Sequence, residues 1–288
     1  DVPPFMFSGI RQIVAGSLLV LFFYFKGRKL PSKKDLISFS ISGALMIGVG
    51  NGLVAWAEVH VSSGLAAIIC SLVPIWIILF NLVGHRAEKI NGLIIIGMLL
   101  GIIGLLLIFN DNLADFTNPA YTWGIVAIFI ANAGWALGTV ITKKFKTDVD
   151  PINASGWQIF LGGLCLGTVS LLSEDLSQAN FTIEATFALV YLIFFGSILA
   201  FGCYIYALSK LPAGLVAIYA YVNPVVAVLL GWLVLGEKIN LTVVLACGII
   251  LLGIFMVNQG YKTTGNYFWS KYVKELPTRK KKPYFEKH

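Results

Sequence analysis

Charged residues are scarce in this chain of 288 residues, because Asp, Glu, Lys and Arg together make up 12% of it, whereas a typical soluble domain contains about 25%. Hydrophobic residues make up 58%, and the mean hydropathy is +0.84. This composition excludes a water-soluble globule. The apolar stretches are continuous and do not alternate in polarity, which excludes a membrane β-barrel.

Motifs for catalysis and metal binding are also lacking. The sequence holds no Gly-rich phosphate loop, no His–Glu zinc motif, and no nucleophilic Ser or Cys with a histidine nearby. We therefore expect no enzymatic activity, no cofactor and no bound metal. The cysteines lack metal-ligand spacing, and we interpret them as small packing residues inside apolar segments: Cys70, Cys165, Cys203 and Cys247.

Long apolar stretches follow one another along the chain. Each is about 20 residues long, which is enough to cross a bilayer as a helix. We therefore expect an all-α polytopic membrane protein with nine helices in this sequence. The stretches are 4–25, 36–57, 63–83, 90–109, 121–142, 153–172, 186–208, 212–235 and 240–258.

Residues 51–109 and 201–258 are two copies of one pattern. Repeated halves in a membrane protein are typical of transporters built around a central site. The matching positions are Gly64 with Gly214 and Pro74 with Pro224 at an offset of 150, the sequence EKIN at 88–91 and 237–240 at 149, and Ser8-Gly9 with Ser155-Gly156 at 147.

Nine helices do not divide into two equal halves. Shifting the helix predicted at 121–142 back by 147 residues places its counterpart before Asp1. We therefore expect a bundle of ten helices in two inverted five-helix repeats, with nine helices present here and the first one missing. A true nine-helix protein is the alternative. The repeats would cover 1–110 and 120–259, and a basic tail would follow at 260–288.

The distribution of charge predicts the orientation in the membrane. Nineteen of the 21 basic residues fall in alternate loops and the tail, all on one side of the predicted helices. The positive-inside rule makes that side cytoplasmic, so we expect a bacterial inner membrane protein with a cytoplasmic C-terminus. The net charge of +7 then requires no nucleic-acid partner. The tail either contacts lipid headgroups or stays solvated. The other side carries Glu58, Asp111, Asp115, Glu174, Asp175, Glu184 and Glu237.

Arg11 is the only full charge well inside a predicted helix, about 10 Å from its outer end. Its guanidinium group is suited to binding a carboxylate or phosphate of a substrate. The alternatives are an ion pair with Glu58 and extension of the side chain toward lipid headgroups. Gln158 occupies the equivalent position of the second repeat, so a site built on Arg11 would be asymmetric.

Pro74 and Pro224 each fall within a predicted helix, where proline removes a backbone hydrogen bond and bends the chain. At equivalent positions of two inverted halves they are candidate gates, with static kinks as the alternative. Polar and aromatic residues around them are candidate substrate ligands, although some of the rings could anchor in the lipid interface. These candidates are Asn51, Trp56, Ser71, Asn132, Trp135, Tyr204, Tyr219, Tyr221 and Asn223.

Small residues mark surfaces for close helix contact. Gly97, Gly101 and Gly104 form a flat surface on one helix, and Gly248 and Gly253 form a weaker counterpart on the last. Such surfaces bring helix backbones together either within a bundle or between two copies of a chain. A homodimer and a monomer are therefore both compatible with the sequence.

The sequence WAEVHVSSGLAA at 56–67, followed by LVP at 72–74, resembles the signature of the EamA-type members of the drug/metabolite transporter superfamily. The sequence YVNP at 221–224 is similar to that family's second repeat, and WALGT at 135–139 to the opening helix of that repeat. The resemblance covers 1–260. It implies ten helices in two inverted repeats, a central cavity, and export of amino acids or other small metabolites.

The sequence therefore predicts a secondary transporter that exports a small metabolite by alternating access. Two other classes are weighed beside it. A flippase for lipid-linked precursors would have a lateral opening between helices and a basic headgroup site. A membrane scaffold that transports nothing would have a dry, fully packed core.

Overall fold

The computed structural model describes residues 2–82, 90–235 and 240–264, which are helical and contain no strand. Eight stretches among them are long and apolar enough to cross a membrane, and the shorter apolar helix α6 (Gly92–Ile108) joins them. The predicted fold class, an all-α polytopic membrane protein, is confirmed. Residues 88–89 and 237–239 of the two EKIN motifs lie outside the described residues, as does the tail after 264.

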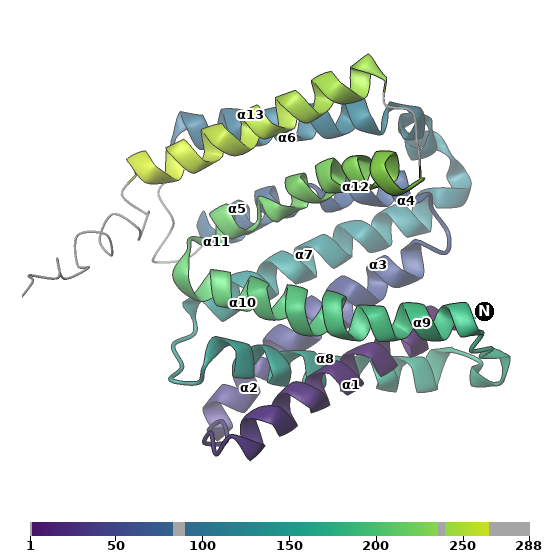
Figure 1. Ribbon diagram of the computed structural model, residues 1–288, viewed down its shortest axis with the longest axis vertical. Coiled ribbons are helices and arrows are strands. Elements are labelled where there is room, and N and C mark those ends of the chain that lie inside the picture. Colours follow the sequence, from purple (N-terminus) through teal and green to yellow (C-terminus); the bar gives the residue numbers. More distant parts are fainter. Residues whose placement is uncertain (1, 83–89, 236–239, 265–288) are drawn as a thin grey trace, which may run out of the picture.

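The first half of the chain forms α1 to α6, and the second half forms α7 to α13 (Figure 1). The elements before α6 are α1 (Pro4–Phe25), α2 (Lys33–Gly43), η1 (Ala44–Asn51), α3 (Gly52–Ala57), α4 (Ser63–Cys70) and α5 (Val73–Leu82). Those after it are η2 (Asn110–Thr117), η3 (Pro119–Tyr121), α7 (Thr122–Lys144), α8 (Pro151–Ser173), η4 (Leu176–Gln178), α9 (Ile183–Tyr191), η5 (Leu192–Leu199), α10 (Ala200–Lys210), α11 (Ala213–Val216), α12 (Tyr219–Leu235) and α13 (Leu241–Thr263).

Side chains fix where several helices begin. Ser32 and Asp35 form a capping box at the start of α2, in which each side chain accepts a hydrogen bond from the other residue's backbone N–H. Asn91 and Asn240 cap α6 and α13 in the same way, by accepting from N–H groups three residues on. These two asparagines are 149 residues apart, so the duplication extends to the helix caps.

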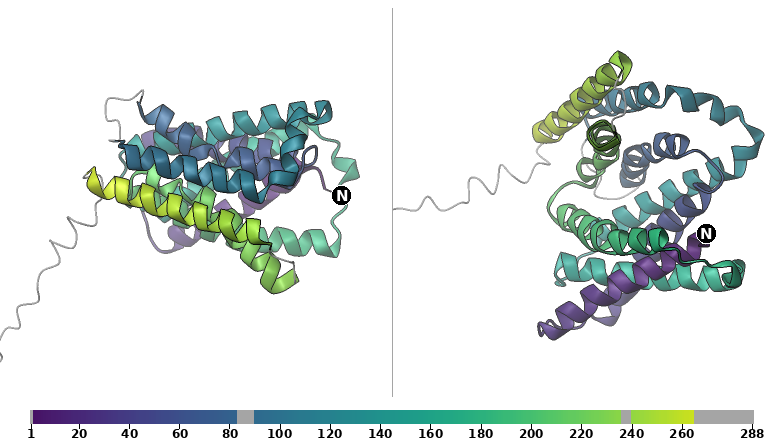
Figure 2. Two further views of the ribbon diagram at one scale, coloured as in Figure 1. Left: turned by 90° about the horizontal axis from the view of Figure 1, so that it is seen from above. Right: turned by 45° about the vertical axis from the view of Figure 1, so that its right-hand side comes forward.

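Equivalent helices of the two halves pack against each other. α1 lies along α8 at one edge of the bundle, and α6 lies along α13 at the opposite edge (Figures 1 and 2). A Cβ atom on Gly97 would lie 2.5 Å from the carbonyl oxygen of Gly253, and a Cβ on Gly253 would lie 2.5 Å from that of Gly97. These glycines therefore make a close contact within the bundle. Gly248, by contrast, faces open space.

Two π-helices interrupt the membrane-spanning stretches. η1 joins α2 to α3, and η5 joins α9 to α10, with both ends of η5 lying 148 residues after those of η1. Gly48 and Gly196 occupy the same position in the two segments. The sequence predicts uninterrupted helices here. The paired π-helices are therefore a structural feature that apolar length alone does not reveal, and π-helical turns are frequent at functional sites.

Candidate substrate cavity

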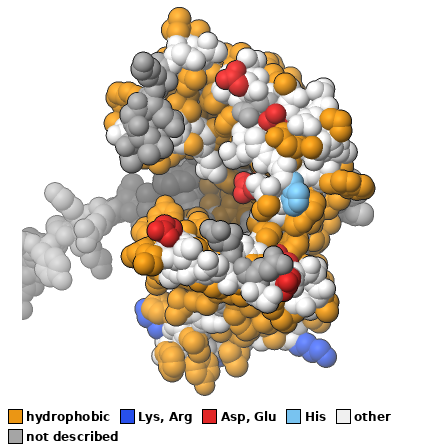
Figure 3. Space-filling model, turned by 90° about the vertical axis from the view of Figure 1, so that its right-hand side faces the viewer, with side chains coloured by type: hydrophobic (Ala, Val, Ile, Leu, Met, Phe, Trp, Pro, Cys, Tyr) orange, Lys and Arg blue, Asp and Glu red, His pale blue; other side chains and the backbone are white. Residues whose placement is uncertain are grey.

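Acidic residues gather at the end of the bundle where α3 ends and α4 begins, which we call the acidic end. Figure 3 looks onto this end and shows a central hollow with hydrophobic side chains inside it and acidic side chains around it. The Lys and Arg side chains visible in this view lie at its lower edge. The described acids of this end are Glu58, Asp111, Asp115, Glu174, Asp175 and Glu184.

Three of the predicted ligands form an aromatic cluster, which consists of Trp135 on α7, Tyr204 on α10 and Tyr219 on α12. The ring centroid of Tyr204 lies 5.5 Å from that of Trp135 and 5.5 Å from that of Tyr219. The hydroxyl of Tyr204 also shares a hydrogen bond of 2.7 Å with Thr139. All three rings are half-buried, although helices of both halves surround them. Rings that border an internal hollow would show this partial exposure.

Cys70 and Glu58 continue the aromatic cluster toward the acidic end. The thiol of Cys70 lies within electrostatic range of both Tyr219 and Glu58. Glu58 is the residue that ends α3, and its carboxylate forms no hydrogen bond or ion pair within the described part of the chain. More than a third of the residue is exposed, yet the surrounding protein desolvates its carboxyl group and raises its pKa. A carboxylate at the mouth of a cavity has this combination of properties.

Cys70 and Glu58 were not predicted from the sequence as part of a site. Cys70 was predicted to be a packing residue, and Glu58 was considered as a partner for Arg11. The one available signal was that Glu58 directly follows Trp56 and Ala57 at the end of a predicted helix. The packing of α3 against its neighbours determines the direction of the Glu58 carboxylate. This packing cannot be read from the sequence.

Arg11 lies at the border of the buried face of α1, because Ser8 and Ala15 are buried whereas Val14 and Leu18 are exposed. Its Nε atom is buried without a hydrogen-bond partner. The ion pair with Glu58 that we considered is absent from the described structure. Extension of the side chain toward lipid headgroups stays an alternative. Arg11 thus presents a cation that no described acid neutralises.

Gln158, the counterpart of Arg11 in the second repeat, has a different environment. Its side chain is buried and its Nε2 donates to the hydroxyls of Ser42 at 3.0 Å and Thr142 at 3.2 Å. These contacts join α8 to α2 and α7. The asymmetry between the repeats that the sequence predicts at this position therefore extends to the contacts.

Several other predicted ligands support the fold and do not join the aromatic cluster. Asn132 on α7 donates to the carbonyl of Ile69, and the hydroxyl of Ser71 donates to that of Ile68. Both contacts add a side-chain hydrogen bond to a carbonyl group in the last turn of α4. Tyr221 is fully buried in a separate core between α6, α12 and α13, against Gly101.

The remaining predicted ligands are dispersed. Asn51 is the half-buried last residue of η1, and no side-chain hydrogen bond joins it to the described residues. Asn223 is exposed on α12, next to the exposed residues Val222 and Val226. Trp56 stacks on His60 with ring centroids 4.3 Å apart. The structure therefore brings together only part of the predicted set.

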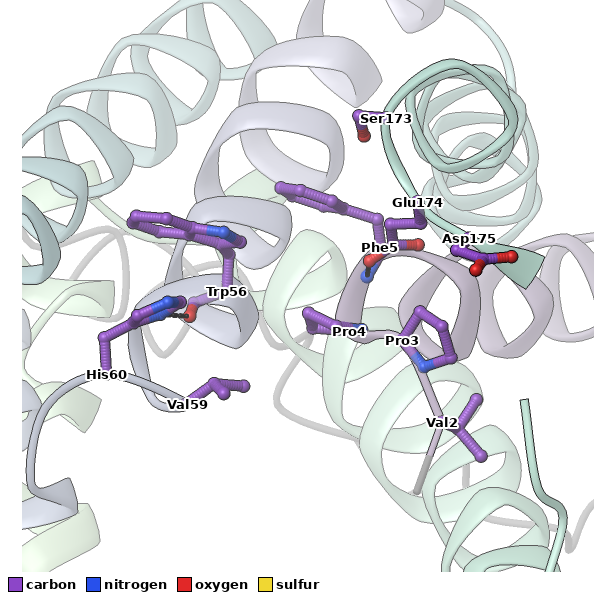
Figure 4. A pocket seen from close by; sticks show the side chains of 10 residues that line it. All are labelled: Val2, Pro3, Pro4, Phe5, Trp56, Val59, His60, Ser173, Glu174 and Asp175. Atoms are coloured by element: carbon purple, nitrogen blue, oxygen red, sulfur yellow. Dashed lines mark hydrogen bonds between the residues drawn. The ribbon is translucent and has the colours of Figure 1, made fainter. Parts of the chain in front are cut away.

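Trp56 and His60 border a second pocket at the acidic end, between α1, α3 and the end of α8 (Figure 4). Its volume is about 520 Å³. Figure 4 shows Trp56 and His60 on one side and Phe5, Glu174 and Asp175 on the other. This pocket is lined by Trp56 but by none of the aromatic cluster.

The two prolines occupy different positions in their helices. Pro74 is the second residue of α5, where an N–H donor is not needed, and the break before it falls at Ser71 and Leu72. Pro224 lies inside α12, while the break of that half falls earlier, at 217–218. The two helix breaks therefore do not lie at equivalent positions of the two halves. Pro74 lies at the start of its helix, whereas Pro224 lies inside its helix. Their role as gates stays a prediction.

At the opposite end of the bundle, polar contacts join the helices that surround the hollow. The Nζ of Lys143 on α7 donates to the carbonyl of Leu208 on α10 at 2.8 Å. The contact between Thr139 and Tyr204 joins the same two helices about one turn deeper. Together with the contacts of Gln158, these bonds tie α2, α7, α8 and α10 to one another below the hollow.

Comparison with known proteins agrees with this architecture. Residues 1–110 and 122–259 match the EamA-like transporter family, so the chain belongs to that family. It is a membrane transporter and not an enzyme. One solved structure, titled only as the crystal structure of a protein, has a TM-score of 0.76 and 18% identity, and the alignment covers 90% of this chain and 89% of the other. It supports the fold alone.

Two of three named relatives carry names that describe them as transporters. The chain is 34% identical over 261 residues to the uncharacterized inner membrane transporter YedA of Escherichia coli (strain K12), covering 90% of this chain and 82% of YedA. It is 26% identical over 259 residues to the uncharacterized transporter YoaV of Bacillus subtilis (strain 168), covering 89% and 87%. It is 29% identical over 239 residues to the protein PecM of Dickeya dadantii (strain 3937), covering 82% and 77%.

Proposed function

We propose that this protein is a secondary transporter that exports amino acids or related small metabolites by alternating access. The observation that carries the proposal is the aromatic cluster, which joins α7, α10 and α12 beside the central hollow. Ligand sites are concave, largely apolar and aromatic, with a few polar groups that fix orientation. The cluster supplies apolar faces and hydroxyl groups, while Glu58 and Arg11 supply charge.

The difference between the two ends of the bundle supports alternating access. The central hollow opens at the acidic end, and polar contacts of Lys143, Tyr204 and Gln158 join helices at the other end. If the basic loops are cytoplasmic, as we expect, this arrangement is an outward-facing state. Inverted repeats would exchange conformations to give the inward-facing state.

Transport in proteoliposomes tests the proposal. Vesicles would be loaded with labelled aromatic, aliphatic, basic and acidic amino acids, and efflux would be compared with that from protein-free vesicles. We expect Trp135→Ala to lower kcat/KM by about tenfold, since an aromatic contact is worth about 1 kcal/mol or more. Trp123→Ala is the matched control, because Trp123 lies on the same helix and is 76% exposed.

Folding of both variants would be checked by size-exclusion chromatography in detergent. The proposal fails if the wild-type protein releases no member of the panel faster than protein-free vesicles do. It also fails if the folded Trp135→Ala variant transports like the wild-type protein.

A further inference from the structure

We propose that Glu58 binds the ammonium group of the transported molecule, so that the central hollow selects amine-bearing compounds with an apolar or aromatic body. This inference rests on the proposed transport function and names the substrate class of the same site. An ammonium group and a desolvated carboxylate form a charge-assisted hydrogen bond, which is among the stronger polar contacts in proteins.

The position of Glu58 supports this assignment. Its carboxylate has no partner within the described part of the chain, and it lies near Cys70, which in turn lies near Tyr219. The rings of Tyr219 and Tyr204 follow at 5.5 Å. In this assignment, a molecule whose amine contacts Glu58 lays its apolar part against the aromatic cluster. Aromatic faces also attract cations directly.

The sign of the surrounding charge favours a cation. Acidic side chains surround the hollow in the view onto this end (Figure 3). A cavity mouth lined by one sign of charge concentrates ligands of the opposite sign. Burial desolvates the carboxyl group of Glu58 and raises its pKa, and no described cationic side chain pairs with it. Binding of an ammonium group would supply that partner.

Arg11 provides the contrast. Its guanidinium group lies on α1 and forms no ion pair with Glu58 in the described structure. We therefore assign the two charges to different groups of a ligand. A molecule with only an ammonium group depends on Glu58, whereas one with only a carboxylate depends on Arg11.

Three related probes separate these roles: phenylalanine, phenethylamine and 3-phenylpropionate. They share an aromatic body and differ in carrying both charges, the cation alone or the anion alone. Binding to the detergent-solubilised protein would be measured by calorimetry, and efflux would be measured from proteoliposomes. The variants are Glu58→Gln, Glu58→Asp and Arg11→Gln. Asp111→Asn is the control, because Asp111 is exposed at the same end.

We expect Glu58→Gln to weaken binding of phenylalanine and phenethylamine by about tenfold and to leave that of 3-phenylpropionate within about twofold. Glu58→Asp should retain part of the affinity, and Asp111→Asn should bind all three probes like the wild-type protein. Unchanged binding of the two amines by folded Glu58→Gln would overturn the assignment. So would an equal loss for all three probes, because Glu58 would then serve a step common to every substrate, such as proton movement.

The two measurements distinguish this inference from the proposed function. Glu58-dependent binding of amines without efflux of any probe or panel member would retain the site and reject transport. Efflux of the amines at equal rates by the wild-type protein and by Glu58→Gln would retain transport and reject the role of Glu58.

Discussion

The carboxylate of Glu174, at the end of α8, accepts a hydrogen bond of 2.8 Å from the backbone N–H of Phe5, in the first turn of α1. Its second oxygen accepts another of 2.8 Å from Met6. No side chain caps α1 locally, since its N-cap is Pro3. A residue from the other half of the chain therefore satisfies two of the unpaired N–H groups of this helix.

We expect Glu174→Gln to lower the free energy of unfolding by about 1 kcal/mol, because the amide group offers only one acceptor to two N–H groups. Thermal unfolding in detergent would show a lower midpoint. Glu184→Gln is the control, since Glu184 is exposed and lies at the same end. An unchanged midpoint in Glu174→Gln would mean that the contact does not stabilise α1.

The close contact between α6 and α13 predicts that two glycine substitutions on α13 differ in their effect on stability. We expect Gly253→Ala to destabilise the protein by about 1 to 3 kcal/mol, because its Cβ would lie 2.5 Å from the carbonyl oxygen of Gly97. Gly248→Ala on the same helix has nothing within 4 Å of its Cβ and should change stability by less than about 0.5 kcal/mol. Equal effects of the two substitutions, measured by thermal unfolding, would contradict the close packing.

The pH dependence of amine binding follows from the raised pKa of Glu58. As pH falls, its carboxyl group takes up a proton at a higher pH than an ordinary glutamate does, and the neutral form no longer attracts an ammonium group. We therefore expect the affinity for phenethylamine to fall as pH is lowered through this raised pKa. Binding titrations across the acidic range would measure it.

Glu58→Gln tests this titration directly, because glutamine carries no acidic proton. The variant should bind phenethylamine weakly and with little change over the same pH range. A pH dependence that persists in Glu58→Gln would show that Glu58 is not the group that titrates.

The gating hypothesis now predicts unequal effects of the two prolines. Ala at Pro224, inside α12, adds an N–H group that can bond to the carbonyl of Ala220 and stiffen the helix. Ala at Pro74, the second residue of α5, restores no interior hydrogen bond. We expect Pro224→Ala to slow substrate exchange in liposomes and Pro74→Ala to leave it nearly unchanged. Equal exchange rates in both variants and in the wild-type protein would mean that the prolines only shape the helices.

The sequence predicted the membrane-spanning stretches well because apolar length is a local property. It also identified the contact surface at Gly97 and Gly253, since few side-chain types permit such close approach. The π-helices η1 and η5 were missed, because an extra residue in a helical turn leaves the apolar composition unchanged. Recognition of the family came from short paired motifs, which the match over 1–110 and 122–259 confirms.

The site was only partly predictable. Trp135, Tyr204 and Tyr219 were found because polar and aromatic groups inside a membrane bundle need a reason to be there. Asn132 and Ser71 met the same criterion, but they bond to backbone carbonyl groups at the end of α4. Sequence alone does not distinguish a polar side chain that faces a cavity from one that faces a helix end.

Labelling of Cys70 tests the central claim most directly. This thiol is half-buried near both Glu58 and Tyr219. A variant in which Cys165, Cys203 and Cys247 are replaced by Ala would be reconstituted and treated with a membrane-impermeant thiol reagent from each side. We predict that the reagent labels Cys70 slowly, because burial desolvates this thiol, and only from the acidic end. A transported substrate should slow the labelling further, and the labelled protein should lose efflux. Labelling that no substrate slows, in a protein that retains full efflux afterwards, would contradict a substrate path through this hollow.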